Sequence, residues 1–229
     1  GLTFVSSILL MLFLKFKINS DLNIREIILA SCVLLWTIRL SFFLFQRVKR
    51  VGKDVRFDNL KFSFSKFLLA WMTQGLWVFI CLFPTLIVFS SPTNNEIFYL
   101  IFGVLVYLVG LVTEIIADYQ KTIHNRLNNK KLKFISSGLW SMSRHPNYFG
   151  EFLIWTGITI ICFPVFSGFK YLAFITPIFI YFLLNYISGV NLLEERAKEK
   201  WGKNPEYVKY LKTTPCLLYT SPSPRDIGE

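Results

Sequence analysis

The sequence predicts an all-α, polytopic helical membrane protein, and three observations support this fold class. Hydrophobic residues make up 53% of the 229 residues, and the chain contains 24 Phe. Its mean hydropathy is +0.47. Several apolar windows approach the roughly 20 residues that a helix needs to cross a bilayer. Lys and Arg concentrate in alternate connections between these windows. A soluble α-helical bundle is the alternative, but a soluble domain of this size would not be this apolar.

About six membrane-spanning segments are expected, and they cover residues 1–14, 26–46, 64–90, 97–117, 147–165 and 170–187. The first is short. Because the chain begins at Gly1 inside an apolar run, without a Met, we expect that its true N-terminus is missing. Pro84 is expected to kink the third segment. The stretch after the sixth segment is charged and helix-forming, with breaks expected at Gly202 and Pro205.

The positive charges predict the topology. Three connecting segments are rich in Lys and Arg, namely 47–66, 118–144 and 191–215. The alternate connections, "SSPTNNE" and residues 164–170, carry almost none. By the positive-inside rule the three basic segments share the cytoplasmic face, together with the C-terminus. The net charge of +11 is explained in this way, and no nucleic-acid partner is expected.

The end of the chain differs in character from the rest. Residues 216–229, which begin "CLLYTSPSPRD", resemble a transposase-type sequencing adapter translated in frame. We therefore expect a single integral membrane domain over residues 1–215, followed by a non-native tail. Of the four cysteines, Cys216 lies in this tail and the others lie in apolar runs, so neither a metal site nor a disulfide framework is predicted.

Two carboxylates, Glu114 and Asp118, lie near the cytoplasmic end of the fourth segment. Their i, i+4 spacing places them on one face of a helix. Like charges in a weakly hydrated place repel each other, so each needs a cation or a hydrogen-bond donor. The pair is either solvated by lipid headgroups, or paired with Arg144, or part of a site that accepts hydroxyl or amide donors from a ligand.

The densest polar cluster is "SRHPNYFGE", which directly precedes the fifth segment. Pro146 favours an extended conformation at His145 and a helix that begins at the proline. A helix N-terminus presents free N–H groups and the positive end of the helix dipole, which favours anions. Arg144 adds a bidentate partner for a phosphate.

The next residues of this cluster offer further recognition chemistry. Asn147 can both donate and accept hydrogen bonds, as recognition of a carboxamide requires. Tyr148 offers a ring for stacking and a phenolic proton. Glu151, one helical turn after Asn147, can bind hydroxyl groups or orient its neighbours. A purely structural helix cap is the alternative to this site.

A charged stretch follows the sixth segment, and it begins with Glu194, Glu195 and Arg196. A solvated amphipathic helix is one interpretation of it. Its aromatic residues are Trp201, Tyr207 and Tyr210. They lie either at the membrane interface or over a flat cofactor ring. His124, isolated in a basic connection, is expected to be a surface residue.

The sequence resembles a known superfamily at "GLWSMSRHPNYFGE" and "EERAKEKWGKNPEYVKYLKTTP". This superfamily includes steroid 5-alpha-reductases, sterol C14-reductases, isoprenylcysteine carboxyl methyltransferases and phospholipid methyltransferases. The chain is most similar to an uncharacterised, largely bacterial family with a steroid 5-alpha-reductase-like C-terminal domain. Further matching blocks are "LLWTIRLSFFLFQR", "GKDVRFDNLK", "WMTQGLWVF" and "EIIADYQK". The resemblance covers roughly residues 30 to 215.

The resemblance implies a cofactor pocket covered by the cytoplasmic loops and the C-terminal helix. Its expected cofactor-binding residues are Glu114, Asp118, Arg144, His145, Asn147, Glu151, Glu195, Arg196 and Trp201. The reductases use NADPH and the methyltransferases use S-adenosylmethionine. Asn147 and Asp118 match the reductase pattern, whereas "RHP" is shared by both branches. The chain departs from the mammalian steroid reductases at Glu114, where those enzymes have Asn.

The resemblance therefore implies an NADPH-dependent reductase of a C=C bond in a lipophilic, steroid-, sterol- or isoprenoid-like substrate. Tyr148 is the expected proton donor, the substrate would enter from the bilayer, and the cofactor would enter from the cytoplasm. One alternative is an S-adenosylmethionine-dependent lipid or isoprenylcysteine methyltransferase. Another is a membrane lipid-binding protein with a relic pocket. The substrate and the oligomeric state stay open.

Overall fold

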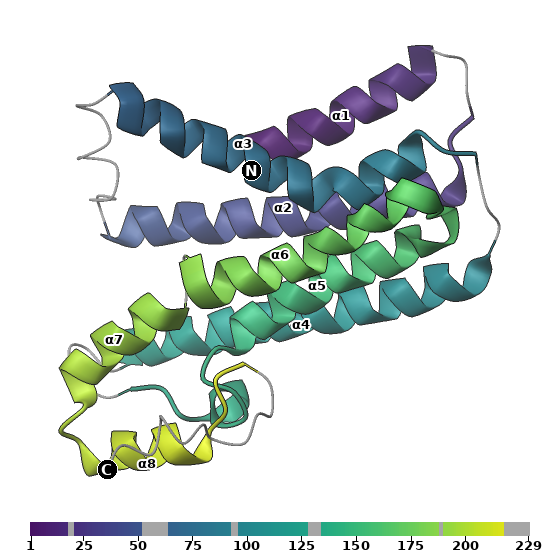
Figure 1. Ribbon diagram of the computed structural model, residues 1–229. Helices are drawn as coiled ribbons and strands as arrows, with labels where there is room; N and C mark the ends of the chain where they lie inside the picture. Colours follow the sequence, from purple (N-terminus) through teal and green to yellow (C-terminus); the bar gives the residue numbers. More distant parts are fainter. Residues whose placement is uncertain (18–20, 52–63, 93–95, 128–133, 188–189, 218–229) are drawn as a thin grey trace. The chain divides into compact units, whose positions relative to one another are not determined.

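The computed structural model describes residues 1–17, 21–51, 64–92, 96–127, 134–187 and 190–217, and these parts are helical, without a strand. Five of the described helical segments are long and apolar enough to cross a membrane (Figure 1). They are Ile24–Lys49, Phe64–Phe89, Ile97–Leu127, Pro146–Val165 and Gly168–Tyr186. The predicted all-α, polytopic membrane fold is confirmed. The first predicted segment, 1–14, forms the shorter helix α1 (Leu2–Lys17).

The chain divides into two compact units, which we describe separately. Unit 1 comprises residues 1–103 and 158–176, and unit 2 comprises residues 104–157 and 177–229. Parts of the expected basic connections, including residues 52–63 and 128–133, and most of the adapter-like tail, 218–229, lie outside the described residues.

Unit 1 is built around α1, α2 (Ile24–Val51) and α3 (Phe64–Phe89). A single buried residue of α1, Phe4, joins all three helices. Its ring packs edge-to-face against Trp36 of α2 at 5.2 Å and against Trp77 of α3 at 5.5 Å. Such aromatic pairs contribute about 0.5–1.5 kcal/mol each beyond the burial of their area. The large rings therefore hold α1 on the other two helices.

Helix α3 continues through Pro84, and its ribbon bends in its second half (Figure 1). Proline has no N–H, so the carbonyl of Ile80, four residues earlier, loses its partner within the helix. Thr176 replaces it, because its fully buried hydroxyl donates to the Ile80 oxygen at 2.7 Å. Thr176 lies at the start of α6 (Ile175–Phe182), which follows the 3-10 helix η4 (Gly168–Phe174). The proline thus creates a fixed contact between α3 and α6.

A buried cation, Arg25, closes one end of unit 1. Its guanidinium donates to the carbonyl of Glu96 at 2.8 Å and to that of Ile161 at 3.2 Å. Ile161 lies in the last turn of α5 (Pro146–Cys162), where carbonyls have no partner within the helix. Beside Arg25, the buried Glu26 pairs with Lys15 at 2.8 Å. These contacts satisfy polar groups that would otherwise be costly within the apolar unit, except the Nε–H of Arg25, which has no partner among the described residues.

Unit 2 contains most of α4 (Ile97–Leu127), the first part of α5, and the C-terminal helices α7 (Val190–Trp201) and α8 (Pro205–Thr213). Helices α4 and α5 touch backbone to backbone at two glycines. A Cβ on Gly110 would lie 2.7 Å from the Gly150 oxygen, and a Cβ on Gly150 would lie 2.7 Å from the Gly110 oxygen. Small residues permit such an approach between membrane helices. It places the buried Glu114 directly against α5.

Candidate functional site

A cavity of about 500 Å³ lies in unit 2, lined by residues from the end of α4, the segment before α5, and α7 and α8. This volume falls within the ~300–1,000 Å³ that is usual for small-molecule and cofactor sites. Two of the predicted cytoplasmic segments, 118–144 and 191–215, supply most of its lining. The cavity therefore brings together the regions that carry the two strongest sequence blocks.

The lining of the cavity is strongly cationic. Its permanent cations are Lys121, Arg144, Arg196 and Lys200. A single carboxylate, Glu194, faces them within the described lining, together with the imidazoles of His124 and His145. The half-buried His124, expected to be a surface residue, thus lies in the cavity wall. An excess of cations around a partly buried space favours an anionic occupant.

Aromatic rings form a second part of the wall. The ring of Phe134 lies 5.1 Å from that of Tyr207, 5.3 Å from that of Tyr210 and 6.3 Å from that of Trp201. Tyr207 and Tyr210 belong to α8, so this short helix presents its buried face to the cavity. Trp201, Tyr207 and Tyr210 thus line a cavity, while their position over a flat cofactor ring stays a prediction.

The turn before the 3-10 helix η2 (Gly138–Ser141) depends on a glycine. Gly138 has a φ of +64°, a conformation that residues with a Cβ rarely adopt. A Cβ there would also collide with the side chain of Gln120. The Gln120 oxygen accepts a hydrogen bond from the Leu139 N–H at 3.0 Å, which fixes η2 on α4.

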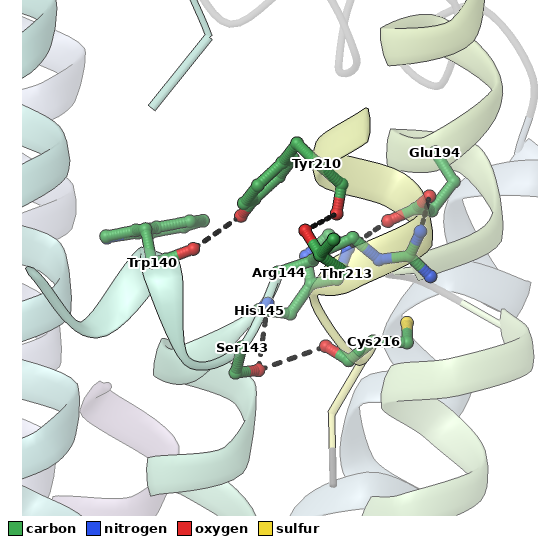
Figure 2. Close-up of polar contacts among 8 residues, drawn as sticks. All are labelled: Trp140, Ser143, Arg144, His145, Glu194, Tyr210, Thr213 and Cys216. Atoms are coloured by element: carbon green, nitrogen blue, oxygen red, sulfur yellow. Dashed lines mark hydrogen bonds and ion pairs between the residues drawn. The ribbon is translucent and has the colours of Figure 1, made fainter. Parts of the chain in front are cut away.

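Trp140 of η2 connects α4 with α8. Its indole N–H donates to the Ala117 carbonyl of α4 at 3.1 Å. Its own carbonyl accepts a hydrogen bond from the Tyr210 hydroxyl at 2.6 Å (Figure 2). The ammonium group of Lys121 lies 5.0 Å from the centre of the Trp140 ring, in a cation–π contact. This chain of contacts fixes one wall of the cavity.

Helix α5 begins at Pro146, as predicted, and the C-terminal segment binds the backbone of the two residues before it. The N–H of Arg144 donates to the Pro215 carbonyl at 2.9 Å, and the N–H of His145 donates to the Cys216 carbonyl at 3.1 Å. Both residues precede α5, so the expectation of free N–H groups in the first turn of the helix stays a prediction. The contacts are made by backbone carbonyls, so they do not depend on which side chain stands at position 216.

Glu194 of α7 contacts two side chains of the segment before α5, those of Arg144 and His145 (Figure 2). Its Oε1 lies 2.9 Å from Nε2 of His145, and its Oε2 lies 3.5 Å from Nη1 of Arg144. Burial of this carboxylate raises its pKa, but the hydrogen bond from His145 and the charge of Arg144 outweigh burial, so the pKa of Glu194 is lowered. Glu194 is therefore ionised at neutral pH.

The sequence identified Glu195 rather than Glu194 as a site residue. Glu195 is exposed and does not line the cavity. Successive residues point about 100° apart on a helix, so the rotation of α7 about its axis decides which of the two carboxylates faces the cavity. A π-helical turn (Leu183–Ile187) ends the preceding helical segment, so an ideal α-helical spacing cannot be extended from α6 to α7. The only signal for Glu194 was its place beside Glu195 and Arg196.

The remaining predicted site residues divide into three groups. Arg144, His145, Arg196 and Trp201 line the cavity. Glu114 and Asp118 are buried on α4, while Asn147 and Glu151 are half-buried on the first turns of α5, and none of these four lines it. Tyr148 is half-buried, and its ring stacks on that of His145 at 5.6 Å with an interplanar angle of 12°.

One cluster near the cavity has the composition of a metal site. Ligand atoms of His145, Glu194 and Cys216 lie within 4.8 Å of one another. A cation bound there would be repelled by Arg144 and would compete with the hydrogen bond between His145 and Glu194. Cys216 also lies in the segment that the sequence leads us to expect to be a non-native tail. The arrangement is better described as an ion-paired wall of the cavity.

Comparison with known proteins gives one family. A family model described as a protein of unknown function (DUF1295) matches residues 2–214. No curated protein and no solved structure matches the chain.

Proposed function

The chain belongs to the DUF1295 family, and from that premise we propose that it is a membrane-embedded, NADPH-dependent reductase of a C=C bond. The proposed substrate is lipophilic and of the steroid, sterol or isoprenoid kind. The choice of NADPH as cofactor rests on the charge of the cavity. Its described lining has four permanent cations and one carboxylate.

The two cofactors of the superfamily differ in charge. NADPH carries a pyrophosphate and a further phosphate, so it is a multiple anion. S-adenosylmethionine has no phosphate and carries a sulfonium cation. Arg144, Arg196, Lys121 and Lys200 attract the first and repel the second. The charge of the lining therefore supports NADPH.

The aromatic wall supports the same proposal. Phe134, Trp201, Tyr207 and Tyr210 provide flat, amphipathic surfaces beside the cations. A dinucleotide has two planar rings and charged groups between them, which suits a lining of this mixed character. The pocket volume alone does not select a ligand, but charge and aromatic surface together favour a nucleotide.

In the proposed reaction the chain binds the cofactor, excludes water and supplies a proton. When bound, the nicotinamide supplies a hydride to the electron-poor carbon of the alkene. Tyr148, with its ring against His145, is the proposed donor of the proton that the other carbon takes up. The resemblance selects Asn147, Glu114 and Asp118 for the carboxamide and hydroxyl groups of the cofactor, but they lie outside the lining of the cavity, so that contact stays a prediction. By the positive-inside rule, the proposed cofactor site and the C-terminus are cytoplasmic.

The methyltransferase alternative makes a different demand on the site. A bound sulfonium needs carboxylates or aromatic faces around it. Glu194 is the one carboxylate in the described lining, and it is already paired with Arg144 and His145. This pairing is an argument against the methyltransferase. Thermal unfolding with each cofactor distinguishes the two enzymes.

Thermal unfolding of the purified protein in detergent tests the proposal, with NADPH, NADP⁺ and S-adenosylmethionine compared side by side. A ligand present at 100 times its Kd stabilises the native state by about 2.7 kcal/mol. We expect NADPH and NADP⁺ to raise the Tm and S-adenosylmethionine to leave it unchanged. Stabilisation by S-adenosylmethionine alone would replace the reductase proposal with the methyltransferase one.

A further inference from the structure

Glu194 lies in a part of the cavity wall that is suited to an anion. Its carboxylate lies between Arg144 and His145, and these two residues directly precede the N-terminus of α5. The positive end of that helix adds to the charge of Arg144. The cavity thus contains its own anion, placed against Arg144 and His145.

Arg144 is only partly satisfied by this arrangement. Its side chain is 10% exposed, and its contact to Glu194 is a single one, at 3.5 Å. Its Nε–H is buried and has no hydrogen-bond partner among the described residues. A guanidinium binds a carboxylate or phosphate best through two parallel hydrogen bonds. Arg144 therefore has an unused donor that a better-placed anion would take.

We propose that Glu194 is a resident anion of the ligand-free cavity, and that a phosphate group of the bound ligand displaces it from Arg144 and His145. The inference rests on the proposed function in one respect, namely that the ligand of the cavity is anionic. Because the Nε–H of Arg144 is covered, the exchange requires this side chain to turn away from Glu194. Ligand binding then changes the contact between α7 and the segment before α5.

The exchange has a measurable consequence. In the wild-type protein an incoming phosphate must compete with Glu194 for the same two side chains, so the affinity is lower than the cations alone would give. Removing the charge of Glu194 while keeping its shape removes the competitor. Were Glu194 instead a direct acceptor for ligand hydroxyl groups, the same change would weaken binding of the complete cofactor.

The test compares Glu194→Gln with Glu195→Gln, a matched control. Both changes remove one negative charge from α7, but Glu195 is exposed and does not line the cavity. The Kd values for inorganic pyrophosphate and for NADP⁺ are measured by calorimetry on the full chain in detergent at one salt concentration. We expect Glu194→Gln to bind pyrophosphate about tenfold more tightly than the wild type, which corresponds to one charged hydrogen bond. Glu195→Gln should stay within about twofold of the wild type, because solvent and salt screen an exposed charge.

The outcomes separate this inference from the proposed function. If the wild type binds pyrophosphate and NADP⁺ but Glu194→Gln binds them equally or more weakly, the resident-anion role is wrong and the cofactor site stands. If neither protein binds either probe, the cavity is not an anion site, and both proposals fail. The melting temperature of each variant is recorded first, so that a folding defect is recognised.

Discussion

Nε2 of His145 lies 2.9 Å from Oε1 of Glu194, and this contact joins the segment before α5 to α7. The two residues are 49 positions apart in the chain. Each residue supplies one side of the same cavity wall. The contact also makes Glu194 the residue whose charge can be tested most simply.

The stability of the protein should depend on the ionisation of Glu194. Its pKa is lowered in the folded state, so its contribution to stability is present above the unfolded pKa of about 4.5 and is lost as the pH falls through the folded pKa. Glu194→Gln should therefore have a lower melting temperature than the wild type at about pH 7, with a smaller difference at about pH 4. A difference that stays constant over this range would contradict the ion-pairing assignment.

The contact between α4 and α5 should not tolerate a methyl group at its glycines. Gly150→Ala is expected to destabilise the protein by about 1–3 kcal/mol, because its Cβ would lie 2.7 Å from the Gly110 oxygen. Gly75→Ala in α3 is the control, since a Cβ there meets nothing within 4 Å. Thermal unfolding in detergent should separate the two variants, and equal melting temperatures would mean that α4 and α5 lie farther apart.

The hydroxyl of Thr176 should matter because Pro84 is present. Thr176→Val leaves the buried Ile80 carbonyl without a donor, at an expected cost of about 1–3 kcal/mol. Pro84→Ala restores an N–H within α3, so Thr176→Val should cost less in that background. The free energies of unfolding of the four proteins form a double-mutant cycle. A coupling of zero would show that the hydroxyl does not serve the carbonyl that proline leaves free.

The hydroxyl of Tyr210 should hold α8 on η2. Burial raises the pKa of Tyr210, so the phenol keeps its proton and can donate to the Trp140 carbonyl. Tyr210→Phe should cost about 0.5–1.5 kcal/mol in stability and should weaken NADPH binding, because one wall of the cavity loses its attachment. Tyr119→Phe is the control at an exposed tyrosine of α4. Unchanged melting and binding in Tyr210→Phe would contradict a role of this hydrogen bond.

The helices could be predicted from sequence because a bilayer requires long apolar runs. The predicted segment 64–90 differs from α3 by one residue, and the one that began at 147 starts at Pro146. The breaks at Gly202 and Pro205 also separate α7 from α8 as expected. In each case a local signal, either apolar length or a helix breaker, determines the boundary.

The lining of the cavity was predicted less completely, because it depends on contacts between distant segments. Phe134 enters the aromatic wall through contacts with α8, and no periodic pattern marks it. Glu194 was missed because the helical phase of α7 could not be known from the sequence. Asn147 and Glu114 were selected by resemblance, and their roles toward a cofactor remain predictions, since neither lines the cavity.

The most direct test of the central claim is the equilibrium binding of NADPH and S-adenosylmethionine to variants of the cavity cations. Arg196→Ala combined with Lys200→Ala removes two charges from the lining, whereas Lys209→Ala combined with Lys212→Ala removes two exposed charges of α8 outside it. We predict that the wild type binds NADPH and not S-adenosylmethionine. The double substitution of Arg196 and Lys200 should weaken NADPH binding by at least about tenfold. The double substitution of Lys209 and Lys212 should have little effect on NADPH binding. Binding of S-adenosylmethionine alone, or equal effects of the two pairs, would contradict an anionic nicotinamide cofactor in this cavity.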